Sequence, residues 1–139
     1  MSLRFLLDSN TLSEPVRPSP NPQVMRRIEE HRKEMAVAAP VWHELLFGSE
    51  RLPRSRRRER IESYLWDIVA ASLPILSYDQ AAATWHASER ARLEAIGRTP
   101  PYVDGQIAAI ARTNDLVLVT ANGADFAGFN GLSVEDWRG

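Results

Sequence analysis

Residues 4–11 read RFLLDSNT, an apolar run followed at once by polar residues. An apolar run without alternating polarity is typical of a strand that is covered on both faces. The side chains of Asp, Ser, Asn and Thr favour leaving a strand and capping a helix. We therefore expect a first strand that ends at Leu7 and turns into a helix after Asp8.

The same alternation of strand and helix continues along the chain. Short apolar runs predict further strands at residues 35–38, 75–77 and 116–120 and a short last strand at 132–134. Cap residues and prolines predict helices that begin at Pro22 after Asn21, at Pro40, after Ser55, after Asp79 and near Val103. Four prolines within residues 15–22 predict a loop before the first of these helices. The pattern is typical of an α/β protein, a three-layer α/β/α sandwich with a central, mainly parallel sheet of four to five strands.

The clearest amphipathic helix follows Ser55. Apolar residues recur there at helical spacing and predict one stripe that faces the core: Ile61, Tyr64, Leu65, Ile68 and Val69.

Length and composition limit the class of protein. The chain has 139 residues, a net charge of −1 and no cysteine. This length predicts one domain over residues 1–139. The absence of cysteine excludes disulfides, thiolate zinc sites, iron–sulfur clusters and a cysteine nucleophile. No apolar stretch is long enough to span a bilayer and the first residues lack a signal-peptide pattern, so we expect a cytoplasmic protein without a membrane partner.

Four acidic residues are expected at one edge of the sheet. Asp8 and Asp125 follow apolar strands, and Glu44 and Asp104 lie in the first turns of helices. In such sheets the carboxyl ends of the strands and the N-termini of the following helices meet at one edge. Gathered carboxylates stay ionised only when a cation neutralises them, and oxygen ligands favour Mg²⁺ or Mn²⁺. The sequence therefore predicts a divalent-metal site that acts on a phosphoester.

Five motifs occur in order along the chain. They are FLLDSN at 5–10, VWHELLFG at 41–48, Asp104 with IAAIA at 107–111, LVTANGADF at 118–126 and GLSVEDW at 131–137. Together they resemble the motifs of PIN-domain ribonucleases, and specifically those of the VapC family, the toxins of type II toxin–antitoxin pairs.

This resemblance implies a metal-dependent endoribonuclease with a PIN fold. Asp8, Glu44, Asp104 and Asp125 would hold Mg²⁺ or Mn²⁺, with Thr120 and Asn122 shaping the loop around Asp125. The ion would activate a water for attack on phosphorus, which gives a 5′-phosphate and a 3′-hydroxyl. Asp125 would serve either a second ion or the attacking water, so the choice between one ion and two stays open. Gly105 departs from the family pattern, in which a larger residue usually follows the aspartate.

The resemblance also implies three partners: a cognate antitoxin that blocks the site, an RNA substrate and a second copy of the chain. Tyr64, Leu65 and Ile68 would either extend the core or cover that second copy. Six arginines fall within residues 51–60 and have two interpretations. They form either a solvated helix start or a contact with RNA phosphates or an acidic stretch of the antitoxin, through Arg51, Arg54, Arg56, Arg57 and Arg58.

Rival functions are less consistent with the residues. A phosphatase of the haloacid dehalogenase type needs a second aspartate at position 10, which is Asn10, and a response-regulator receiver needs a late lysine, whereas the only lysine is Lys33. The strongest rival is a catalytically silent PIN fold that only binds RNA or a protein. The intact set of acids favours the enzyme. The histidines, His31, His43 and His86, lack metal-ligand spacing and are expected to be structural or solvent-facing.

Overall fold

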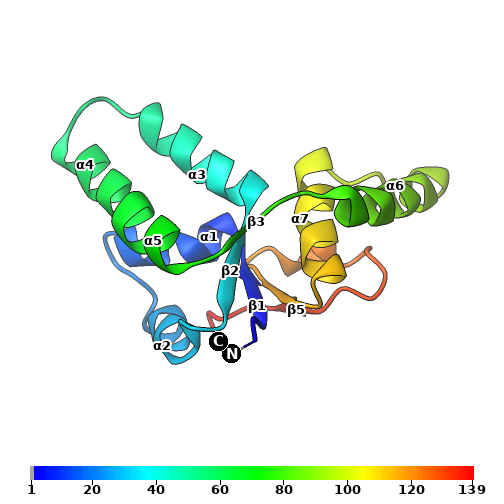
Figure 1. Cartoon of the computed structure of the whole chain (residues 1–139), viewed down its shortest axis with the longest axis horizontal. Coiled ribbons are helices and arrows are strands. Elements are labelled where there is room, and N and C mark those ends of the chain that lie inside the picture. The colour runs from blue at the N-terminus through cyan, green and yellow to red at the C-terminus, as the bar shows by residue number, and fades with distance from the viewer. Residues whose placement is uncertain (1) are drawn as a thin grey trace.

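The chain folds around a five-stranded parallel sheet, seen in a computed structural model that describes residues 2–139. The strands are β1 (Phe5–Leu7), β2 (Met35–Ala38), β3 (Ile75–Leu76), β4 (Val117–Val119) and β5 (Val134–Glu135). Their order is β3-β2-β1-β4-β5, with β1 at the centre (Figure 1). All pairs are parallel, which confirms the sheet expected from the sequence.

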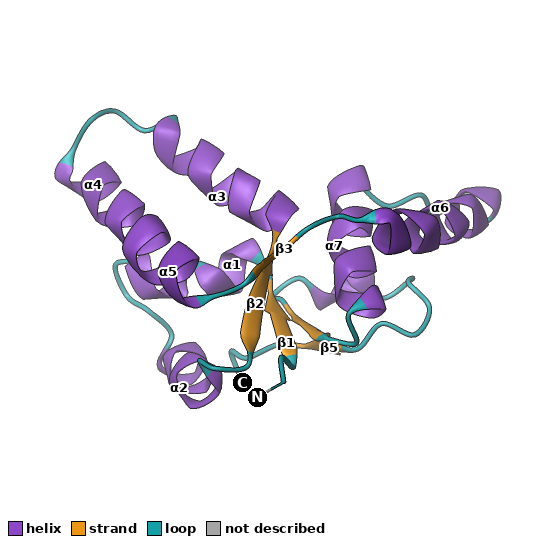
Figure 2. Ribbon diagram, in the orientation of Figure 1, coloured by secondary structure: helices purple, strands orange, loops and turns teal. Residues whose placement is uncertain are grey.

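Helices connect successive strands and cover both faces of the sheet, so the molecule has three layers (Figure 2). The helices of the first half of the chain cover one face of the sheet, and α6 and α7 cover the other face (Figure 1). The helices are α1 (Ser9–Leu12), the 3-10 turn η1 (Glu14–Val16), α2 (Pro22–His31), α3 (Ala39–Glu50), α4 (Arg56–Ser63), the π-helical segment η2 (Tyr64–Val69), α5 (Ala70–Ser72), α6 (Gln80–Ala95), α7 (Tyr102–Thr113) and the 3-10 turn η3 (Gly123–Phe126).

The cap residues begin and end the helices where the sequence predicts. The side-chain oxygen of Asn21 accepts hydrogen bonds from the first turn of α2, and Ser55 and Asp79 do the same for α4 and α6. Gly97 follows α6 with a φ of +71°, a left-handed conformation that glycine adopts without steric cost. Side-chain capping therefore sets the starts of α2, α4 and α6.

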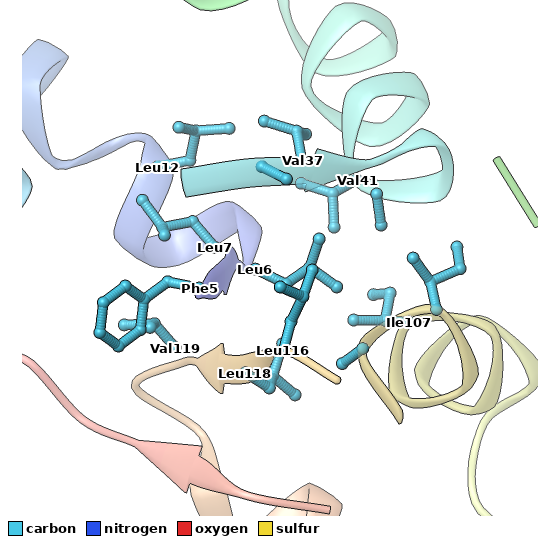
Figure 3. Packing of buried hydrophobic residues seen from close by; sticks show 14 of the residues in the cluster. Phe5, Leu6, Leu7, Leu12, Val37, Val41, Ile107, Leu116, Leu118 and Val119 are labelled. Atoms are coloured by element: carbon cyan, nitrogen blue, oxygen red, sulfur yellow. The ribbon is translucent and has the colours of Figure 1, made fainter. Parts of the chain in front are cut away.

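The core lies on both faces of the central strands. Leu6, Val37 and Leu118 are fully buried, and Val41 and Ile107 pack onto them from α3 and α7 (Figure 3). Because both faces of the sheet are covered, its strands are continuous apolar runs rather than alternating ones. Across residues 2–139, no helix combines the length and the apolar character that crossing a bilayer requires.

Two predictions from the sequence are wrong in detail: the burial of Ile68 and the start of the last strand. Leu65 and Val69 are buried, but Ile68 is 57% exposed. The cause is the π-helical segment η2, whose wider turns rotate residue 68 away from the core. The last strand begins at Val134 rather than at residue 132, because Gly131, with a φ of +72°, holds the preceding chain in a turn.

Candidate active site

Asp8 is fixed at the carboxyl end of β1 by the register of the sheet. Leu7 of β1 is paired with Val119 of β4, so the next residues, Asp8 and Thr120, lie side by side. One carboxylate oxygen of Asp8, Oδ1, accepts a hydrogen bond of 2.8 Å from the N–H of Ser9, and Oδ2 accepts one of 2.9 Å from the Thr120 hydroxyl. Asp8 is only 7% exposed. Its carboxylate therefore has a defined orientation before any ligand binds.

The loop after β4 is held by side chains from two motifs. The N–H of Asn122 donates to the Thr120 hydroxyl oxygen (3.1 Å), and the N–H of Ala121 donates to Oδ1 of Asn10 (3.1 Å). The backbone carbonyl of Asn122 then accepts from the N–H of Asp125 (3.0 Å), at the start of η3. Thr120 and Asn122 thus lie where the sequence places them. The sequence alone does not predict that Asn10 bonds the loop after β4, although Asn10 lies only two residues after Asp8.

The pKa of Asp104 is affected by all three of the other predicted ligands. It lies half-buried in the first turn of α7. Burial raises the pKa of Asp104 above its ordinary value, and the negative charges of Asp8, Asp125 and Glu44 raise it further. Like charges disfavour ionisation only when they are close in space. The fold therefore brings acids from four separate segments near enough to interact.

Glu44 and Asp125 line two different hollows. Glu44 is exposed on α3 and lines a hollow of about 450 Å³ beside α4, together with Arg57, Arg60 and Tyr64. Asp125 is exposed on η3 and lines a second hollow with Asp104 and Arg98. Each of these two acids therefore shares a hollow with at least one arginine.

The chemistry of this donor set suits a hard divalent cation, because all four groups are carboxylates. The positions of these side chains, however, do not complete a metal site. Over residues 2–139, no three acidic or histidine side chains converge as they stand on a point that a metal ion could occupy. Mg²⁺ typically uses one or two carboxylates and keeps several of its waters. The chemistry of these residues therefore fits a water-rich site, and they do not form a ready-made cage.

Gly105 shows why the residue after Asp104 is so small. A Cβ at this position would overlap Nε2 of His86 and lie 2.7 and 2.8 Å from the ring carbons Cδ2 and Cε1. The His86 ring is 2% exposed, and its Nδ1 lies 2.9 Å from the Tyr78 hydroxyl oxygen. His86 is thus structural, as expected, and it packs α6 directly against the turn of α7 that carries Asp104.

The arginine run divides into residues with different environments. The Arg51 guanidinium lies 4.8 Å from the centre of the Phe47 ring, and Arg58 bonds the carboxylate of Glu62 and the carbonyl of Leu52. Arg54, Arg56, Arg57 and Arg60 are exposed. Arg57 and Arg60 face the hollow that contains Glu44, so part of the run lies beside the acids.

Comparison with known proteins gives consistent matches over nearly the whole chain. Residues 5–132 match the family described as PIN domain. The chain is 33% identical over 135 residues to the tRNA(fMet)-specific endonuclease VapC of Shigella flexneri, covering 97% of this chain and 98% of that protein. It is 30% identical to toxin FitB of Neisseria gonorrhoeae, covering 91% and 96%. Among solved structures, DNA-bound VapBC from Salmonella typhimurium matches with a TM-score of 0.84 at 30% sequence identity, covering 97% of this chain and 98% of that one.

Proposed function

The chain belongs to the PIN-domain family, and from this premise we propose that it is a toxin endoribonuclease that cuts RNA with a bound Mg²⁺ or Mn²⁺ ion. Asp8, Glu44, Asp104 and Asp125 would hold the ion. The observation that carries this assignment is the gathering of four acids from separate segments around Asp104, whose pKa is raised first by burial and then by the charges of Asp8, Asp125 and Glu44. Such a group of carboxylates is costly to ionise without a cation, which supports a metal-binding role.

In the proposed reaction, a bound divalent ion would supply a more acidic water and neutralise charge on the phosphate. The chain itself would supply orientation. Ser9 and Thr120 fix both oxygens of Asp8, and Asn10 with Asn122 fixes the loop that leads to Asp125. We propose that Asp8, Glu44 and Asp104 bind the ion directly or through water. Asp125 would bind a second ion or orient the attacking water.

Metal addition should stabilise the protein and switch cleavage on. Because an ion that binds only the folded state stabilises it by RT ln(1 + [L]/Kd), Mn²⁺ at a hundred times its Kd should add about 2.7 kcal/mol to the free energy of unfolding. We expect the thermal midpoint to rise on titration with Mn²⁺ and RNA cleavage to stop in a chelator. The first RNA to test is tRNA(fMet), the RNA in the name of the Shigella relative.

The control for this titration is Asp8→Asn, which should show little or no rise in thermal midpoint. Cleavage that persists in a chelator would contradict the proposed function. RNA binding without cleavage at any Mn²⁺ concentration would instead favour the silent binding module.

We further propose that the chain acts in the cytoplasm as a single domain with a cognate antitoxin as its partner. Solved relatives are toxin–antitoxin complexes, including FitAcB from Neisseria gonorrhoeae at 28% identity and a TM-score of 0.84. A homodimer is also proposed. Exposed Trp66 and Ile68 on η2 are apolar surface that a second copy would bury.

The arginines beside Glu44 should contribute to RNA binding. Changing Arg57 and Arg60 together to glutamine should weaken RNA binding and make it less sensitive to salt. For single strands, each lost phosphate contact makes the negative slope of log K against log salt shallower by about 0.7. Fluorescence polarisation over a range of salt concentrations measures this slope. The matched pair is Arg26→Gln on α2 and Arg32→Gln at its C-cap.

An unchanged salt slope together with weaker antitoxin binding would assign the two arginines to the protein partner. If the affinities for RNA and for the antitoxin are both unchanged, the arginines of residues 51–60 are only a solvated helix start.

A further inference from the structure

One exposed face of α3 and its C-cap residue carries a row of planar side chains. His43, Phe47 and Arg51 recur at intervals of four residues and therefore share this face. The ring centres of His43 and Phe47 are 6.2 Å apart, and the Arg51 guanidinium lies 4.8 Å from the Phe47 ring centre. Phe47 is 54% exposed. The Phe47 ring therefore contributes little to the core and is accessible to a ligand.

This row borders a groove between α3 and α7, which we call the α3–α7 groove. It has a volume of about 480 Å³ and is lined by Pro40, His43, Glu44, Phe47, Val103 and Gln106, together with Ala39 and Tyr78. Val103 is 44% exposed on the facing helix. Glu44 lines both this groove and the arginine-containing hollow, so the groove adjoins one of the four acids of the candidate active site.

We propose that the α3–α7 groove is a subsite for one unpaired base of the RNA substrate, next to the bond that is cut. This inference rests on the proposed function and names the feature of the substrate that the site reads. Unpaired RNA bases are typically bound by stacking on aromatic side chains and on arginine planes. The Arg51 guanidinium covers one face of the Phe47 ring, so a base would stack on the other face. The amide of Gln106 can donate to and accept from the edge of that base.

The polar groups of the groove favour a nucleotide over an apolar protein segment. Glu44 and Gln106 line the groove beside its aromatic residues, and the guanidinium of Arg51 lies next to it, over the Phe47 ring. A nucleotide has complementary parts, because its base has a flat apolar face and a polar edge and its phosphate is an anion. An apolar helix from a second copy of the chain would leave these polar groups without partners, which is costly.

The test separates stacking from phosphate binding. Two probes are compared: a single-stranded RNA about twelve nucleotides long, within the size range of single-stranded sites, and a ribose–phosphate chain of the same length without bases. Binding is measured on the Asp8→Asn background so that the RNA is not cut. Phe47→Ala should weaken binding of the RNA about tenfold and leave binding of the abasic chain unchanged. Phe47→Tyr should retain the affinity, and Ile96→Ala, which removes a similarly exposed side chain from the end of α6, should change neither.

Each remaining outcome overturns the proposal. If Phe47→Ala leaves RNA binding unchanged, the ring stacks on no base. If it weakens both probes equally and sedimentation shows a dimer becoming a monomer, the groove is a surface for a second copy. Cleavage of the same RNA by the wild-type protein with Mn²⁺ is measured in parallel. Cleavage without the Phe47 effect refutes this inference alone, whereas the Phe47 effect without cleavage refutes the proposed function alone.

Discussion

Replacing Asp104 by asparagine should abolish RNA cleavage, by a factor on the order of 10³ or more, without unfolding the protein. The carboxylate lies in the first turn of α7, near the charges of Asp8, Glu44 and Asp125. Asparagine keeps the size of the side chain and removes the negative charge that an ion would neutralise. Single-turnover cleavage at saturating Mn²⁺ measures the loss, and the Mn²⁺ titration of the thermal midpoint measures the loss of binding.

The same substitution should leave the metal-free protein as stable as the wild type or more stable. Burial and the neighbouring acids raise the pKa of Asp104 in the folded state above its ordinary value of 3.8. The folded state therefore binds more protons than the unfolded state in this range, so stability falls as the pH rises from 3.8 through the raised pKa. Above that pKa the ionised carboxylate opposes folding. Asp104→Asn should remove this part of the pH dependence, seen as a flatter plot of thermal midpoint against pH.

Asp67→Asn is the matched control, because Asp67 is exposed on η2. It should leave cleavage, Mn²⁺ binding and the pH dependence unchanged. Full activity of Asp104→Asn at saturating Mn²⁺ would refute the assignment of Asp104. A lower thermal midpoint at neutral pH would show that the carboxylate has a structural role instead.

The sequence predicts the scaffold of the site well because that scaffold depends on local chemistry. The run that ends at Leu7 becomes β1, and Asn21, Ser55 and Asp79 cap the helices as expected. A parallel sheet then brings Asp8 beside Thr120, since the paired strands β1 and β4 end at the same level. Strand ends and caps are local signals, and the topology rule converts them into a shared edge.

Other features depend on contacts that the sequence does not encode locally. The exposure of Ile68 follows from the π-helical segment, which helical periodicity alone does not reveal. The directions of the carboxylate oxygens depend on rotamers, so the acids are placed near one another while no preformed three-ligand site exists within residues 2–139. The reason for Gly105 lies in His86, which belongs to a different helix.

Gly105→Ala should destabilise the protein, although alanine forms helices better than glycine. The new Cβ would overlap Nε2 of His86 and approach the other ring atoms to 2.7 and 2.8 Å. The ring has little room to retreat, because it is buried and bonded to Tyr78. Overpacking of this kind costs about 1–3 kcal/mol and exceeds the gain of up to about 1 kcal/mol in helix propensity. We expect a lower thermal midpoint and weaker cleavage, since the strained turn carries Asp104.

Gly48→Ala in α3 and the double variant Gly105→Ala/His86→Ala separate the clash from every other effect. A Cβ at Gly48 would meet no atom within 4 Å, so this variant should be as stable as the wild type or slightly more stable. His86→Ala alone should destabilise the protein by leaving a cavity. Because the Cβ added by Gly105→Ala would partly fill that cavity, the double variant should be more stable than the sum of the two single effects predicts. Purely additive effects would mean that the imidazole of His86 does not limit the size of residue 105, and the position of Asp104 would then need another cause.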